Sequence, residues 1–148
     1  MRGSLEAKLV IAAVVALGVT VIFSTNAQAP ASVWDGVYTE DQATGGAALY
    51  QPQCASCHGK ALEGTGQNPP LAGDDFKTNW DGQPLGDLFE KMRTSMPADR
   101  PGKLSGEQNA AILAYMLKRN GFPAGSTPLK GDAKALQPVR FESEKPSK

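Results

Sequence analysis

The chain has 148 residues, with 15 basic and 15 acidic side chains, two cysteines and one histidine. This length fits one domain with appended segments rather than two domains. The balanced charge gives no indication of nucleic-acid binding, which depends on an excess of basic side chains. Two cysteines and one histidine are also too few to supply the four ligands of a structural zinc site.

Residues 1–29 have the pattern of a secretory signal. Basic side chains precede the stretch 9–23, which is 15 residues without a charge, and small residues follow up to Ala29. Because a proline comes next, we expect cleavage after Ala27 or Ala31. The alternative is an uncleaved anchor helix, although 15 apolar residues are short for a membrane span. Either reading predicts a periplasmic domain, attached to the inner membrane only if the segment is retained.

Residues 30–38 are expected to form an irregular lead-in to the folded domain. Thr39 then begins a helix, since Gln42 three residues later completes a capping-box pattern. Pro52 should end this helix, because proline lacks the N–H that a continuing helix requires.

The segment 54–58 reads Cys-Ala-Ser-Cys-His, which is the attachment signature of a c-type haem. Cys54 and Cys57 lie one helical turn apart, so both thiols can form thioether bonds to the vinyl groups on one edge of a porphyrin. His58 then lies under the ring as the first axial ligand. A redox pair of cysteines would need a thioredoxin-like alternation of strands and helices nearby, and a disulfide would leave His58 unexplained. We therefore predict one covalent haem c.

The glycine- and proline-rich stretch 59–73 is predicted to be a loop. Metal-ligating histidines usually donate their second ring N–H to a fixed acceptor, and the carbonyl of Pro69 is suited to receive it from His58. The alternative is that two successive prolines only stiffen a turn. Residues 74–80 are predicted to form a short helix or turn that carries Trp80 inward, where its indole N–H either binds a haem propionate or packs in the core.

Two longer helices follow. Pro84 begins the first, in which apolar residues from Leu85 to Met92 recur on one face that can press against a porphyrin. A second capping box at 105–108 begins the other. Because 110–117 is almost entirely apolar, we expect this last helix to be buried on two sides, by the haem and by the first helix.

Gly121 reads as the stop of the last helix, and prolines follow it. The remaining stretch, 123–148, is polar with little periodicity, so we predict an extended or disordered tail. The folded domain is then expected to cover 39–122.

The second axial ligand must be a residue other than histidine, since His58 is the single histidine. Met92 belongs to the apolar helix face, where packing is its expected role. Met96 is followed by Pro97, which forces Met96 out of the helical region into an extended conformation. We therefore prefer Met96 to Met92. A histidine–methionine pair raises the reduction potential and closes the iron to substrates.

The pattern extends beyond the haem motif to a glycine and a tyrosine before it, a Pro-x-Leu in the loop, the Met-Pro pair and two residues of the closing helix. These residues are Gly46, Tyr50, Cys54, Cys57, His58, Pro69, Leu71, Met96, Pro97, Ile112 and Tyr115. Over 39–122 the chain resembles the class I monohaem cytochromes c. The resemblance implies an all-α fold of three to five helices wrapped around a covalently attached haem. It also implies that Gly46 and Tyr50 meet Ile112 and Tyr115 where the first and last helices cross, and we count Tyr50 among the haem-binding residues.

Two further stretches, 33–39 and 96–105, are similar to segments of bacterial cytochromes that serve quinoprotein dehydrogenases or sulfur-compound oxidation. The resemblance implies an extracytoplasmic electron carrier, not an enzyme, that meets a redox-protein donor and acceptor transiently. The alternative is a dedicated cytochrome subunit of a periplasmic dehydrogenase, with residues 123–148 wrapping its partner. A haem enzyme or gas sensor would instead need an open iron site.

Overall fold

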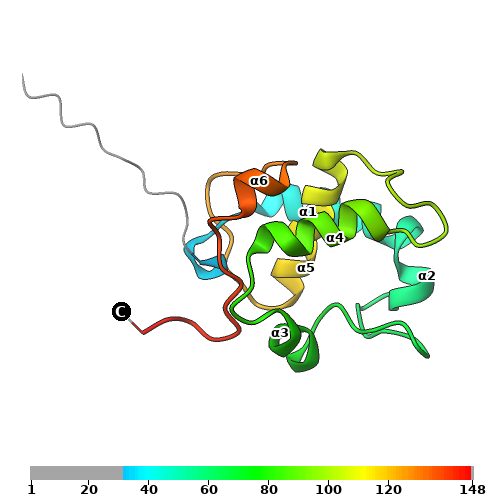
Figure 1. Cartoon of the computed structure of the whole chain (residues 1–148), viewed down its shortest axis with the longest axis horizontal. Helices are drawn as coiled ribbons and strands as arrows, with labels where there is room; N and C mark the ends of the chain where they lie inside the picture. Colours follow the sequence, from blue (N-terminus) through cyan, green and yellow to red (C-terminus); the bar gives the residue numbers. More distant parts are fainter. Residues whose placement is uncertain (1–31, 148) are drawn as a thin grey trace, which may run out of the picture.

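The structure is a computed structural model that describes residues 32–147, so the predicted signal at 1–29 lies outside the described residues. Within 32–147 the chain forms helices and isolated bridges but no β-strand, which confirms the all-α prediction (Figure 1). The elements are η1 (Val33–Asp35), α1 (Glu40–Gln53), α2 (Ala55–His58), α3 (Asp74–Trp80), α4 (Leu85–Ser95), α5 (Gly106–Arg119) and α6 (Ala133–Leu136). Among these described residues, no helix has both the length and the apolar character that a membrane crossing requires.

Helices α1 and α5 cross at Gly46. A Cβ atom on Gly46 would overlap the backbone carbonyl of Ala111, so the close approach of the two helices requires glycine here. One turn later, the ring of Tyr50 packs against that of Tyr115, with centroids 5.4 Å apart. This contact confirms the helix crossing that the resemblance implied.

The two ends of α1 differ from the predicted pattern. Thr39 Oγ1 accepts a hydrogen bond from the backbone N–H of Gln42 at 3.2 Å, as expected of a cap. The side chain of Gln42 does not return to Thr39, and it instead binds the backbone of Leu129. The prediction that Pro52 ends the helix is wrong by one residue, since α1 continues to Gln53. A proline in the last turn removes only one helical hydrogen bond, which the helix tolerates.

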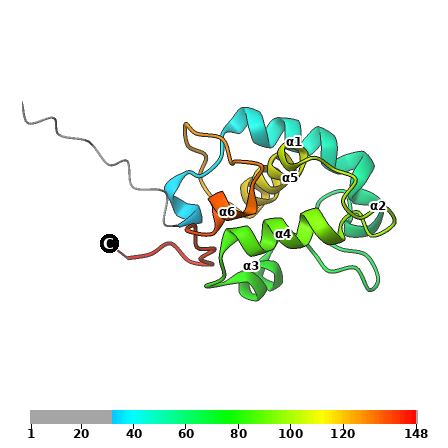
Figure 2. The same ribbon diagram turned by 45° about the horizontal axis from the view of Figure 1, so that its top comes forward.

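Residues 123–147, here called the C-terminal strap, correct the prediction of an extended or disordered tail. Four apolar side chains of the strap are buried against the rest of the domain: Leu129, Leu136, Val139 and Phe141. Their spacing in the sequence follows neither a helical nor a strand period, so no sequence pattern predicts that they are buried. The strap also forms the single turn of α6, which lies over α4 (Figure 2).

The strap holds the beginning of α4 by backbone contacts. The N–H of Leu85 donates to the carbonyl of Val139 at 2.8 Å, and the N–H of Phe141 donates to the carbonyl of Gln83 at 2.8 Å. A Cβ atom on Gly86 would lie 2.5 Å from the carbonyl oxygen of Ala133, so α6 can dock on α4 only because this residue is glycine.

The lead-in also packs against the strap. Trp34 donates its indole N–H to the carbonyl of Glu142 at 2.9 Å, and its ring meets Phe122 edge-on. Tyr38 is buried and donates its hydroxyl to the carbonyl of Phe122 at 2.7 Å. Burial, followed by the nearby carboxylate of Glu40, raises the pKa of Tyr38 to about 12. Residues 32–38 therefore form part of the domain rather than an appendage.

Candidate functional site

A cavity of about 800 Å³ opens between the α1–α2 junction, the loop 59–73 and helices α3, α4 and α5. Six of the seven site residues predicted from the sequence line it: Cys54, Cys57, His58, Pro69, Trp80 and Met96. These residues come from four separate parts of the chain. Tertiary structure therefore brings the predicted site together in one place.

The two cysteines lie on the single turn that continues α1. The N–H of Cys57 and the N–H of His58 both donate to the carbonyl of Cys54, at 3.2 and 2.9 Å. Cys54 is partly buried, and burial, followed by the nearby Cys57, raises the pKa of its thiol to about 11, whereas Cys57 is exposed. One cysteine is thus partly buried and the other exposed, and both line the same cavity.

The imidazole of His58 is held in one orientation. The residue is 8% exposed, and Nδ1 lies 2.9 Å from the carbonyl oxygen of Pro69. Because a carbonyl can only accept, Nδ1 carries the proton and Nε2 keeps a free lone pair for a metal. This contact agrees with the acceptor role that the sequence suggested for Pro69.

Tyr50 does not line the cavity, which corrects its expected place among the haem-binding residues. It is fully buried against Tyr115, and its hydroxyl donates to the carbonyl of Gly59 at 2.8 Å. Burial, and next the nearby Cys54, raises the pKa of Tyr50 well above its usual range, so the hydroxyl stays neutral. Tyr50 therefore supports the backbone that follows His58 and makes no wall of the site.

Three methionines line the cavity: Met92, Met96 and Met116. Met92 and Met116 are buried residues within α4 and α5. Met96 lies at the end of α4 with φ −124° and ψ 149°, which is the extended conformation predicted from Pro97. Its sulfur is thus carried by the start of the loop 96–105, while the other two are carried by helices.

The remaining walls are mainly apolar, with Phe76 from α3, Leu88 from α4 and Ile112 from α5. Trp80 is half-buried at the end of α3 and contributes its ring to the same wall. The prediction that α5 has two covered sides agrees with the structure. Helix α1 contacts one side, and Ile112 and Met116 of α5 line the cavity. Apolar walls, two thiols at one edge, an oriented imidazole and thioether sulfurs together fit a haem. The volume lies in the range of cofactor sites.

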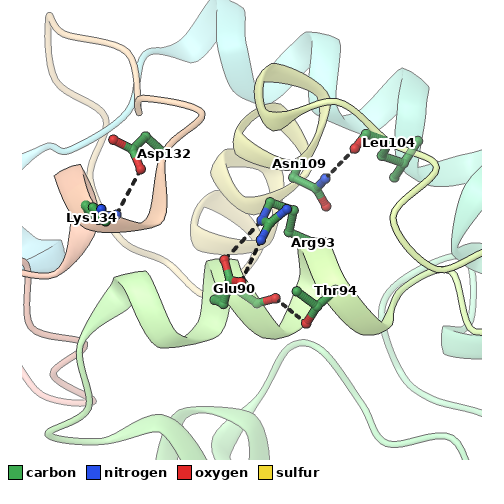
Figure 3. Close-up of polar contacts among 7 residues, drawn as sticks. All are labelled: Glu90, Arg93, Thr94, Leu104, Asn109, Asp132 and Lys134. Carbon is green, nitrogen blue, oxygen red and sulfur yellow. Dashed lines mark hydrogen bonds and ion pairs between the residues drawn. The ribbon is translucent and has the colours of Figure 1, made fainter.

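Sequence reasoning missed two asparagines of α5. Asn109 is buried and donates from Nδ2 to the carbonyls of Leu104 and Ser105, at 3.2 and 2.9 Å, which holds the end of the loop 96–105 (Figure 3). Asn120, at the other end of α5, binds the loop 59–73. A polar residue inside or at the end of an otherwise apolar helix was the available signal.

The outer face of α4 carries an ion pair that does not enter the site. Arg93 and Glu90 are 2.7 Å apart on the exposed surface (Figure 3). The hydrogen bond and charge of Arg93 lower the pKa of Glu90, and those of Glu90 raise the pKa of Arg93. An exposed pair of this kind contributes little to stability.

Among solved structures, the chain is similar to the sulfane dehydrogenase SoxCD from Paracoccus pantotrophus, with a TM-score of 0.49 and 25% sequence identity. The likeness covers 73% of this chain, which spans 61% of the length of that one. No curated protein matches the sequence.

A protein-family model described as cytochrome c oxidase, cbb3-type, subunit III matches residues 41–116, which is slightly more than half of the chain. The matched region contains the two cysteines, the histidine, the loop of Pro69 and all three methionines of the cavity. Proteins of this family bind haem c covalently and act as electron carriers rather than as catalysts. The chain therefore belongs to this family of class I monohaem cytochromes c.

Proposed function

We propose that this chain is an exported, periplasmic electron carrier whose single haem iron is ligated by His58 and Met96. The observation that carries the proposal is the 2.9 Å contact between His58 Nδ1 and the carbonyl of Pro69, in a cavity that Met96 also lines. This contact leaves Nε2 free to bind iron. The partners we propose are a redox-protein donor and a redox-protein acceptor, each bound transiently.

The residues of the chain have separate duties in this function. The haem supplies a one-electron couple, and Cys54 and Cys57 hold it at the cavity edge. His58 donates from Nε2 while Pro69 fixes its ring, which strengthens the imidazole as a ligand. Met96 would provide a thioether sulfur, which favours the reduced state of a bound iron and would close it to other molecules. Apolar walls keep water away, so that only an electron has to move.

Backbone conformation supports Met96 over Met92. Met92 is a buried residue on a continuous helix, where it belongs to the same hydrophobic core as Leu88. Met96 follows the helix in an extended conformation, and the buried Pro97 comes next. Because Met96 lies outside the helix, its side chain can be directed at the iron without any change in α4. Directing the sulfur of Met92 at the iron would instead disturb the apolar face of α4 to which Met92 belongs.

The ligand assignment is tested by the ferric visible spectrum of two variants. Met96→Ala is expected to abolish the sulfur-to-iron charge-transfer band, because no thioether then occupies the sixth position. Met92→Ala is the matched control, since it removes a thioether from the same cavity, and it should keep the band. Loss of the band in Met92→Ala with retention in Met96→Ala would reverse the assignment.

Export is tested by fractionating bacteria that express the full chain and sequencing the N-terminus of the haem-containing protein. We expect a soluble periplasmic product that begins after Ala27 or Ala31, because small residues there suit a signal peptidase. A haem protein recovered only with membranes, with its N-terminus intact, would show that residues 1–29 serve as an anchor.

The alternative of a dedicated dehydrogenase subunit rested on residues 123–148 wrapping a partner. The strap instead uses Leu129, Leu136, Val139 and Phe141 within its own domain. These side chains are therefore not available to a partner, and we favour the free carrier.

A further inference from the structure

The loop that carries Pro69 is held differently at its two ends. Near its start, Tyr50 and Gln51 bind the carbonyls of Gly59 and Lys60. Within it, the N–H of Leu71 donates to the carbonyl of Leu62 at 2.9 Å. Among the hydrogen bonds of residues 32–147, the side chain that reaches residues 71–73 from outside the loop is that of Asn120, besides the contact of His58 with Pro69.

Asn120 follows the last turn of α5 and uses both ends of its amide. Its Nδ2 donates to the carbonyl of Leu71 at 3.0 Å and to that of Met116, one turn back, at 2.8 Å. Its Oδ1 accepts from the N–H of Gly73 at 3.0 Å. One side chain thus ties two loop peptides, 47 and 49 residues away in sequence, to the helix that forms a wall of the cavity.

We propose that Asn120 is a positioning residue for the histidine ligand, acting through the loop and Pro69. Leu71 lies two residues after Pro69, so its carbonyl and the Gly73 N–H fix the position from which the Pro69 carbonyl meets His58. The inference rests on the proposed ligation of iron by His58. It assigns to the last helix a role in setting the electronic properties of the site, besides its packing role.

The expected chemical effect has a definite sign. A histidine whose Nδ1–H is firmly bound to an acceptor is a stronger donor from Nε2, which favours ferric iron. If the loop loosens, the bond from His58 to Pro69 lengthens or opens part of the time. The imidazole then donates less, so the reduction potential rises and the Nδ1 proton exchanges with solvent faster.

The test uses holoprotein with Asn120→Ala and Asn120→Asp. Alanine removes all three hydrogen bonds. Aspartate has the same shape and keeps an acceptor for Gly73, but it sets a carboxylate oxygen against the carbonyls of Leu71 and Met116. If the alanine variant fails to retain haem, the same measurements are made on the isosteric aspartate variant.

Gln42→Ala is the matched control. The amide of Gln42 also binds one distant residue through both its ends, donating to the carbonyl of Leu129 at 2.9 Å and accepting from its N–H at 2.8 Å. Like Asn120 it is half-buried, but it does not line or face the haem cavity. Both changes therefore remove an amide that joins two distant segments, two hydrogen bonds at Gln42 and three at Asn120, in different places.

We expect Asn120→Ala to shift the ferric–ferrous equilibrium about threefold toward ferrous, which is about +28 mV for one electron. The Nδ1–H of His58, followed by NMR, should exchange about tenfold faster, because the loop that holds its acceptor opens more often once the bonds from Asn120 are lost. Gln42→Ala should lower the melting temperature comparably and change neither value. An Asn120→Ala protein that melts earlier but keeps the wild-type potential and exchange rate would overturn the proposal. Absence of iron-shifted His58 signals in the wild type would instead refute the ligation itself, before any variant is compared.

Discussion

The two sides of the cavity are built from different parts of the chain. The histidine side, residues 54–73, is held mostly by bonds between near neighbours. His58 meets Pro69 eleven residues on, and the N–H of Gly64 donates to the carbonyl of His58 at 2.8 Å. The methionine side, residues 85–105, depends on distant segments, since Gln137 binds Asp87 across 50 residues at 2.8 Å.

The two sides should therefore differ in how easily each one opens while the rest of the domain stays folded. Contacts between near neighbours cost little loop-closure entropy, so the bonds within residues 54–73 can form as soon as that loop closes. The bonds from Asn120 to Leu71 and Gly73 are the part that comes from a distant segment. Helix α4 is fixed at its start by the strap, through Leu85 and Gly86. We therefore expect the methionine side to open at a lower free energy than the histidine side.

The largest expected effect comes from Phe141→Ala. Phe141 is 0% exposed and packs between Phe76 and Phe122, with ring centroids 5.8 and 5.1 Å apart. Its removal should cost about 3–5 kcal/mol of unfolding free energy, as is typical of a buried phenylalanine. Phe76 lines the cavity, and Gln83, whose carbonyl accepts from the Phe141 N–H, comes just before α4. The sulfur-to-iron band should therefore disappear on heating before the helices unfold. Parallel visible and far-ultraviolet melts measure this.

Leu129→Ala is the control for that comparison. Leu129 is a buried strap residue that binds Gln42 of α1, away from α4. Its loss should destabilise the domain by about 2–5 kcal/mol while the band and the helices melt together. Coincident melts in Phe141→Ala as well would mean that the strap supports the whole domain and not the methionine side in particular.

A smaller effect is expected from Gly86→Ala. The added methyl group would lie 2.5 Å from the Ala133 carbonyl and 2.7 Å from the Gln137 amide, so α6 must move. After the gain in helix propensity, we expect a net loss of about 1–2 kcal/mol, measured by denaturant titration. Gly45→Ala should have the opposite effect, because a methyl group added at that glycine of α1 meets no atom within 4 Å. This variant should gain about 0.5–1 kcal/mol of unfolding free energy. A stabilised Gly86→Ala would show that the strap does not constrain α4.

Local patterns in the sequence were enough to predict most elements and most of the site. Thr39 and the capping box at 105–108 mark where α1 and α5 begin. The box at 105–108 forms in full, whereas at Thr39 only the bond from the Gln42 N–H forms. Pro97 predicts the extended Met96, and the haem motif with Pro69 predicts the histidine side. Each of these features depends on residues close together in the chain, so the sequence alone carries the information.

The strap and the two asparagines of α5 could not be predicted in the same way. Asn120 looks like an ordinary helix end until Leu71 and Gly73 are placed beside it. The apolar residues of the strap have no period, and Tyr50 has the position of a haem contact but turns its hydroxyl to Gly59. In each case the partner lies on another segment, and a one-dimensional pattern does not specify which segment that is.

The sequence by itself determined the cofactor, the longer helices and the local arrangement around His58, because thioether chemistry, helix caps and a proline loop act over a few residues. The tertiary structure alone decided that α6 of the strap packs on α4 and that Asn120, at the end of α5, holds the loop of Pro69. The physical reason is that burial of scattered apolar side chains and pairing of distant backbone groups depend on three-dimensional proximity, which the whole fold has to supply.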